Sequence, residues 1–106
     1  MLTRYVFFEG TPKVDAAEFR TAVMKVLLPL WQGMPGATGV RLTFAQERDE
    51  GAPEIIMVLA VDYPDRATLD ASLASDHRFV TRDQSAELLG QIFEGKVHHH
   101  ITGKAG

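Results

Sequence analysis

Hydrophobic and polar residues alternate along the chain in a way that predicts four strands. We expect these strands over residues 2–9, 38–47, 54–63 and 96–102, each bounded by Gly, Pro or charged residues. The first and third are apolar at nearly every position, which is typical of strands covered on both faces. The second has one apolar face and one mixed face. Its apolar positions are Val40, Leu42 and Phe44.

The strongest local signal predicts a helix after the first strand. Asp15 and Glu18 have the spacing of a capping box, with Val14 and Phe19 placed as a hydrophobic staple. Pro29 should kink or end this helix, because it lacks a backbone N–H. With a period of 3.6, the helix has an apolar face. Its members are Phe19, Val23, Val26, Leu27 and Leu30, broadened by Met24, Leu28 and Trp31.

Two more helical segments are expected between the third and fourth strands. The first is short, follows Pro64 and Asp65, and carries Leu69 and Leu73. The second begins at a Ser75 cap and ends near Gly90 or Gly95. Its predicted inner side consists of Phe79, Ala86 and Leu89. Residues 103–106 are expected to form a frayed tail.

The order of these elements, β-α-β-β-α-β, indicates a ferredoxin-like α+β fold. It has a four-stranded antiparallel sheet with its helices on one face, in a single domain over residues 1–106. Strands that are apolar on both sides leave the other sheet face in need of a cover. We therefore expect a homodimer in which two sheets pack face to face.

Composition narrows the class of protein. A chain of 106 residues with 45% hydrophobic and 24% charged residues can form one modest core. It has no cysteine, which excludes a disulfide scaffold and a thiolate site. With 11 basic and 14 acidic residues and a net charge of −3, it lacks the basic surface that nucleic-acid binding requires.

We expect a cytoplasmic protein with no membrane partner. No apolar run approaches the ~20 residues that a membrane span needs, and the first residues lack the pattern of a signal peptide.

Three segments give the chain a family resemblance. The first is Leu27-Leu28-Pro29-Leu30, the second is Met34-Pro35-Gly36, and the third is the stretch 67–79, which contains Ser75-Asp76-His77-Arg78-Phe79. In this order, and with a hairpin before the third, they resemble the dimeric α+β barrel superfamily. The EthD-like and antibiotic-biosynthesis-monooxygenase-like branches are the most similar.

The resemblance implies a homodimer with a small-molecule pocket between each sheet and its own helices. Members include cofactor-free oxygenases, dehydratases, isomerases and haem proteins, so the fold transfers better than the chemistry. Leu27 stands where EthD-like members often carry a histidine, so an activity that rests on that histidine is not expected. We assign no cofactor and no metal.

Histidines provide the first group of candidate catalytic residues. His98 and His100 should share one face of the last strand, about 7 Å apart. They could hold a metal with a third ligand, act as acid or base, or simply protect an edge strand. His77, in the first turn of a helix, is either a solvated residue or, as the resemblance implies, an acid or base at the pocket mouth.

The other candidates are aromatic, apolar or cationic. Tyr5 could present its hydroxyl to a ligand as a catalytic acid or lie in the core. Trp31 and Met24 could contact a ligand, although a sheet-facing tryptophan is more often a core residue. Arg41 anchors an anionic ligand, points to solvent, or forms an ion pair at an interface.

Two hypotheses of function follow. The first is a small-molecule binder or a cofactor-free EthD-like or monooxygenase-like oxidoreductase that acts on an apolar or aromatic compound. It requires a cavity of roughly 300 Å³ between sheet and helices. The alternative is a non-catalytic dimeric accessory or interaction protein, favoured by the lack of a recognisable catalytic motif.

Overall fold

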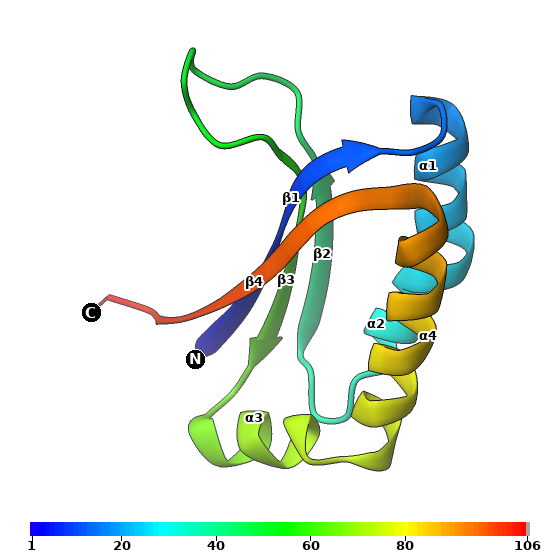
Figure 1. Cartoon of the computed structure of the whole chain (residues 1–106). Coiled ribbons are helices and arrows are strands. Elements are labelled where there is room, and N and C mark those ends of the chain that lie inside the picture. The colour runs from blue at the N-terminus through cyan, green and yellow to red at the C-terminus, as the bar shows by residue number, and fades with distance from the viewer. Residues whose placement is uncertain (106) are drawn as a thin grey trace.

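The chain folds as one antiparallel sheet with helices packed on one face (Figure 1). The computed structural model describes residues 1–105. Its elements are β1 (Leu2–Pro12), α1 (Ala16–Ala22), η1 (Val23–Leu27), α2 (Leu28–Gln32), β2 (Gly39–Phe44), β3 (Ile55–Tyr63), α3 (Arg66–Leu73), α4 (Asp76–Ile92) and β4 (Phe93–Gly103). The strand order is β2-β3-β1-β4, and each neighbouring pair is antiparallel. The predicted ferredoxin-like α+β fold is confirmed.

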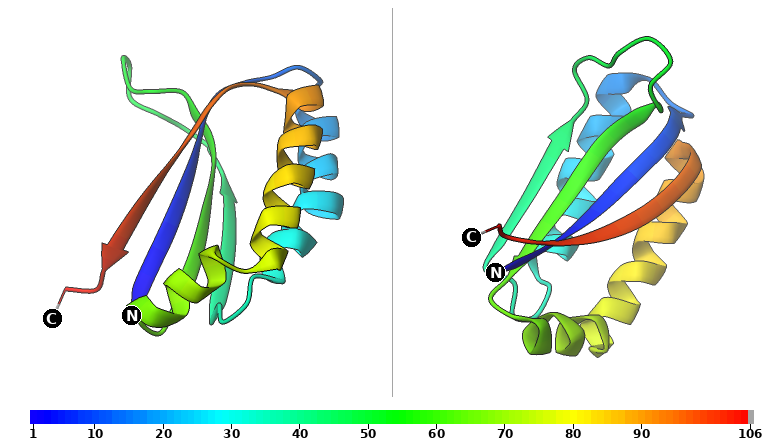
Figure 2. Two further views of the ribbon diagram at one scale, coloured as in Figure 1. Left: turned by 60° about the horizontal axis from the view of Figure 1, so that its bottom comes forward. Right: turned by 90° about the vertical axis from the view of Figure 1, so that its left-hand side faces the viewer.

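The register of the central strand β1 decides which residues face the helices. Val6 of β1 pairs with Leu59 of β3 and His99 of β4, and paired residues share a sheet face. Val6 and Leu59 are buried in the core, so this is the helix face. Tyr5 pairs with His100 and therefore lies on the opposite face. Figure 2 shows that face uncovered, with the helices behind it (right panel), and we call it the open face.

The three predicted helix caps are present. Oδ1 of Asp15 accepts a hydrogen bond from the backbone N–H of Glu18 at 2.8 Å, and Oδ1 of Asp65 accepts one from the N–H of Thr68 at 2.8 Å. The Ser75 hydroxyl oxygen accepts one from the N–H of Arg78 at 3.2 Å. Each cap satisfies a first-turn donor that the helix itself leaves unpaired.

The first helix passes through Pro29 and ends at Gln32, three residues after the proline. The five residues of η1, just before α2, form a π-helix, and the N–H of Leu28 donates to the carbonyl of Val23. This wider turn stretches the apolar spacing to four residues. The buried positions are Phe19, Val23, Leu27 and Trp31, whereas Val26, predicted inside, is exposed.

Helix α4 is rotated relative to its predicted orientation. Phe79, expected on the inner side, is 43% exposed, and the buried positions are instead Thr81, Ser85, Leu89 and Ile92. The apolar pattern misplaced this face because two of its four buried residues carry hydroxyl groups. Hydroxyl-bearing side chains are uncommon on the buried side of a helix. Here they line a cavity instead of packing into the apolar core.

Strand β4 starts at Phe93, three residues earlier than predicted, and is an edge strand as expected. It crosses β1 closely where Gly10 pairs with Gly95. A Cβ atom on Gly10 would lie 2.1 Å from the carbonyl oxygen of Glu94, and both glycines have positive φ angles. Of the expected tail, Gly103 still belongs to β4, while Gly106 lies outside the described residues.

Candidate functional site

A cavity of about 290 Å³ lies between the helix face of the sheet and helices α2 and α4. This is the place the resemblance implied, and the volume is at the lower edge of the range for small-molecule sites. Strand residues form an apolar wall, and Trp31 and Met34 close one side. The wall consists of Val6, Phe8, Leu59 and Val61. The remaining side is polar, and α4 contributes most of it.

Two residues of α4 that line this cavity carry a buried hydroxyl group without a hydrogen-bond partner. Thr81 and Ser85 are 4% and 8% exposed, one helical turn apart, and both line the cavity. Neither hydroxyl oxygen has a hydrogen-bond partner among the described residues. A buried polar group left unpaired costs about 1–3 kcal/mol. Natural sequences rarely tolerate this cost unless a ligand, ion or water supplies the missing bond.

Three guanidinium groups also line the cavity, that of the exposed Arg82 and two others. Arg4 comes from β1 and Arg78 from the first turn of α4, and both side chains are half-buried. Burial, followed by the positive charge of Arg78, lowers the pKa of Arg4. Both groups remain charged at neutral pH. The cavity wall therefore carries fixed positive charge beside its apolar surface.

His99 lines the cavity next to these arginines. Its pKa is lowered to about 4, first by desolvation and then by the charges of Arg4 and Arg78. The imidazole is therefore neutral at pH 7 and offers one nitrogen lone pair as a hydrogen-bond acceptor. Part of the ring stays exposed, since β4 is an edge strand.

Tyr63 completes the polar side from the end of β3. Its ring is almost fully buried and lines the cavity, and its hydroxyl lies 2.9 Å from the hydroxyl of Ser72 on α3. This hydrogen bond satisfies a buried polar pair and fixes the ring. Tyr63 thus differs from Thr81 and Ser85, whose hydroxyls have no such partner.

Among the residues predicted to contact a ligand, only Trp31 lines this cavity. Met24 is 45% exposed and lies outside the cavity lining. His77 lies near the end of α2, where its Nε2 is 3.1 Å from the carbonyl oxygen of Leu30. Because a carbonyl only accepts, this nitrogen donates, and the ring ties the start of α4 to α2.

The predicted residues Tyr5, His98 and His100 gather on the open face instead. His98 stacks on Phe7 at 5.3 Å between ring centroids, and His100 meets the same ring edge-on at 5.3 Å. The two imidazoles are 5.5 Å apart, as alternation along a strand predicts. These rings border a shallow depression of about 440 Å³, which also includes Ile55, Val58 and Thr102.

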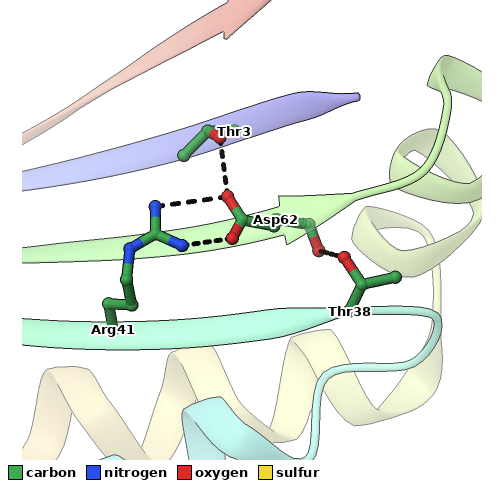
Figure 3. Close-up of polar contacts among 4 residues, drawn as sticks. All are labelled: Thr3, Thr38, Arg41 and Asp62. Atoms are coloured by element: carbon green, nitrogen blue, oxygen red, sulfur yellow. Dashed lines mark hydrogen bonds and ion pairs between the residues drawn. The ribbon is translucent and has the colours of Figure 1, made fainter. Parts of the chain in front are cut away.

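Arg41 lies farther along the open face and pairs with Asp62 (Figure 3). Asp62 is buried and accepts hydrogen bonds from both Arg41 and the hydroxyl of Thr3, the latter at 2.7 Å. The hydrogen bond from Arg41 is the main reason that the pKa of Asp62 is lowered, and the bond from Thr3 contributes. Arg41 therefore forms an ion pair within the chain, and its predicted ion pair at an interface stays a prediction.

Metal ligands are not gathered anywhere in residues 1–105, where no three His, Asp or Glu side chains come together. Among the same residues, no helix is both long enough and apolar enough to cross a membrane.

The sheet and its helices define a ferredoxin-like α+β fold, which several solved proteins share. An EthD-family protein from Bacillus halodurans is 15% identical, with 99% of this chain and 100% of that chain aligned at a TM-score of 0.78. SnoaB, a cofactor-independent oxygenase from Streptomyces nogalater, is 15% identical over 99% of this chain and 93% of its own, with a TM-score of 0.64. A dimeric ferredoxin-like protein from Thermobifida fusca is 9% identical over 97% and 90%, with a TM-score of 0.69.

These similarities establish the fold, at identities too low to carry a function. No protein-family model matches the chain, and no curated protein matches its sequence. The function must therefore be argued from the site itself.

Proposed function

We propose that this protein binds an apolar small molecule in the cavity between its sheet and its helices. The observation that carries the proposal is the pair of buried, unpartnered hydroxyls of Thr81 and Ser85. Polar atoms of a ligand would supply their missing hydrogen bonds, while the strand wall and Trp31 contact its apolar body. The neutral imidazole of His99 adds an acceptor at the edge.

The fold supports placing this protein with EthD-like and cofactor-free monooxygenase-like proteins. SnoaB is a cofactor-independent oxygenase with a similar chain fold, so this fold is compatible with catalysis without a cofactor. In this chain His99 lines the cavity as a neutral imidazole that can accept a hydrogen bond, and its pKa of about 4 makes it a weak proton acceptor.

The open face supports a homodimer. Solved proteins of similar fold are described as dimeric, and here Phe7 carries a cluster of aromatic rings on a sheet face that no described helix covers. Packing two such faces would bury the cluster and leave both helix-side cavities free. His98, His100 and Tyr5 would then contribute to assembly.

A pair of blocking variants tests the ligand site. Ser85→Leu places a larger side chain into the helix-side cavity, and Thr102→Leu does the same in the open-face depression. Saturation-transfer NMR with 2-naphthoate as the probe should show binding to the wild type and to Thr102→Leu, but not to Ser85→Leu. Binding lost only in Thr102→Leu would contradict the proposal. No binding to any of the three proteins would favour the alternative of a non-catalytic dimeric accessory protein.

A further inference from the structure

The charged side chains that line the cavity are all positive. Three arginines and one histidine line it, and no aspartate or glutamate does. Arg82 is neutralised locally, since its guanidinium lies 3.3 Å from Oδ1 of Asp83 and also covers the ring of Phe79. Among residues 1–105, Arg4 and Arg78 form no ion pair and no side-chain hydrogen bond. Two half-buried cations therefore face one cavity without a counter-charge.

Such an arrangement is costly for the empty protein. Each guanidinium carries five N–H donors, and partial burial removes some of the water that would pair with them. Like charges placed close together also repel one another. A bound anion would remove both costs, because a carboxylate can accept two parallel hydrogen bonds from one guanidinium.

The apolar part of the cavity wall restricts the kind of molecule that can carry the anionic group. Beside Arg4 and His99, the strand wall is formed by Val6, Phe8, Leu59 and Val61, which offer only apolar contacts. At about 290 Å³ the space suits a molecule with one or two rings. A highly hydrated polyanion would have to give up its water against this wall, so a body that is mainly hydrocarbon is favoured.

We propose that the ligand is an apolar organic acid whose carboxylate is bound by Arg4 and Arg78. Its hydrocarbon body lies against the strand wall and Trp31, and a further polar atom reaches Thr81 or Ser85. This inference rests on the proposed function and names its ligand class. It also assigns a binding role to two arginines that the sequence pattern did not single out.

A matched pair of probes tests the inference. 2-Naphthoate and 2-naphthamide have the same ring system and nearly the same shape, and only the first is charged. Hydrogen bonds to charged groups contribute about 1.5–3 kcal/mol, so calorimetry should show at least about tenfold tighter binding of the carboxylate. Arg78→Met and Arg4→Met should each reduce this preference several-fold.

Control variants test whether a lost preference for the carboxylate comes from the charge at the cavity, rather than from misfolding or from the net charge of the protein. Arg66→Met removes the same charge on α3, where Arg66 is paired with Asp70 outside the cavity, and should leave both affinities unchanged. If Arg4→Met loses its thermal unfolding transition, Arg4→Lys replaces it. That variant keeps the charge without the forked donor and should retain only part of the preference.

The outcomes distinguish this inference from the proposed function. Equal binding of the acid and the amide to the wild type would overturn the organic-acid ligand and leave the cavity as the binding site. An unchanged preference in both arginine variants would overturn the role of these residues. If neither probe binds at millimolar concentration, the proposed function fails, and this inference fails with it.

Discussion

At the residue scale, the site depends on which of the three consecutive histidines faces the cavity. Alternation places His98 and His100 on one face and His99 on the other, and this much is predictable from the sequence. Which face meets the cavity is set by pairing with β1, where Val6 opposite His99 belongs to the core. No pattern within β4 contains that information.

The arginines of the cavity were missed for a related reason. Arg4 lies in a strand whose other residues are mostly apolar, so it looked like an end residue rather than a wall of a site. Arg78 is one of many charged residues on α4. The available signal was the position of Arg4 two residues before Val6, hence on the same face, and it required the register of the sheet to interpret.

The first prediction concerns the pH dependence of stability. Unfolded His99 takes up a proton near its ordinary pKa of 6.5, whereas the folded protein holds the pKa at about 4. Between these values the unfolded state binds more protons, so stability falls as pH decreases from 6.5 to 4 and this contribution is constant above 6.5. The free energy of unfolding, measured by chemical denaturation across this range, should therefore decrease as the pH falls.

Variants assign the slope to one imidazole. His99→Gln should flatten it, while His98→Gln on the open face should retain it. An NMR titration of His99 with a midpoint near 6.5 would contradict the account. Asp62 and Asp65, whose pKa values are also lowered from 3.8, begin to lose their contributions near pH 5, so the variants are compared between pH 6.5 and about 5.

The second prediction compares a threonine whose buried hydroxyl lacks a hydrogen-bond partner with one whose hydroxyl has a partner. The hydroxyl of Thr81 is buried without a partner, whereas that of Thr3 donates to Asp62 at 2.7 Å. Thr81→Val should leave the free energy of unfolding unchanged or raise it by up to about 1 kcal/mol, and Thr3→Val should lower it by about 1–2 kcal/mol. Thr81→Val should also weaken binding of 2-naphthoate several-fold. Equal destabilisation by both variants, as measured in urea, would show that Thr81 already has a partner.

At the element scale, the strands and caps were predictable and the helix faces were not. Strand alternation and the caps at Asp15, Asp65 and Ser75 rest on local chemistry, which the sequence displays directly. The first helix departs from the 3.6-residue period because its π-helical segment η1 lengthens the turn, which turns Val26 outward and Trp31 inward. Helix α4 departs because it lines a cavity with hydroxyls rather than a core with apolar side chains.

The third prediction tests the close crossing of β1 and β4, which sets the course of the strand that carries His99. Gly10→Ala would place a methyl group 2.1 Å from a backbone oxygen at a positive φ, and should cost about 2 kcal/mol or more. The control is Gly90→Ala on α4, where nothing lies within 4 Å of the new atom. It should stabilise the helix by about 0.5–1 kcal/mol. Thermal unfolding measures both, and a tolerated Gly10→Ala would refute the crossing.

At the scale of the whole molecule, the two faces of the sheet have different proposed roles. The helix face holds the cavity, and the open face holds Phe7 with its neighbouring rings. The sequence predicted that both faces are apolar, and it did not predict which residues serve which face. That division depends on the strand order, in which β1 lies between β3 and β4.

The fourth prediction concerns assembly. Light scattering should give twice the mass of the 11.7 kDa chain for the wild type. Phe7→Glu should shift the protein toward monomer, because it buries a charge in the proposed interface. Ile101→Glu, on the edge strand β4 and on the helix face, should remain dimeric. A wild type that is monomeric at micromolar concentration would contradict the proposed homodimer.

The most direct test of the central claim is a two-dimensional amide NMR titration of the wild type with 2-naphthoate. Trp31 is the only tryptophan, so its indole N–H gives one resolved signal from the cavity wall. We expect this signal to shift together with the amide signals of Arg78, Thr81 and Ser85, while the amide signals of Tyr5, Phe7 and His98 stay in place. Shifts confined to the open-face residues, with the Trp31 signal unchanged, would contradict the central claim.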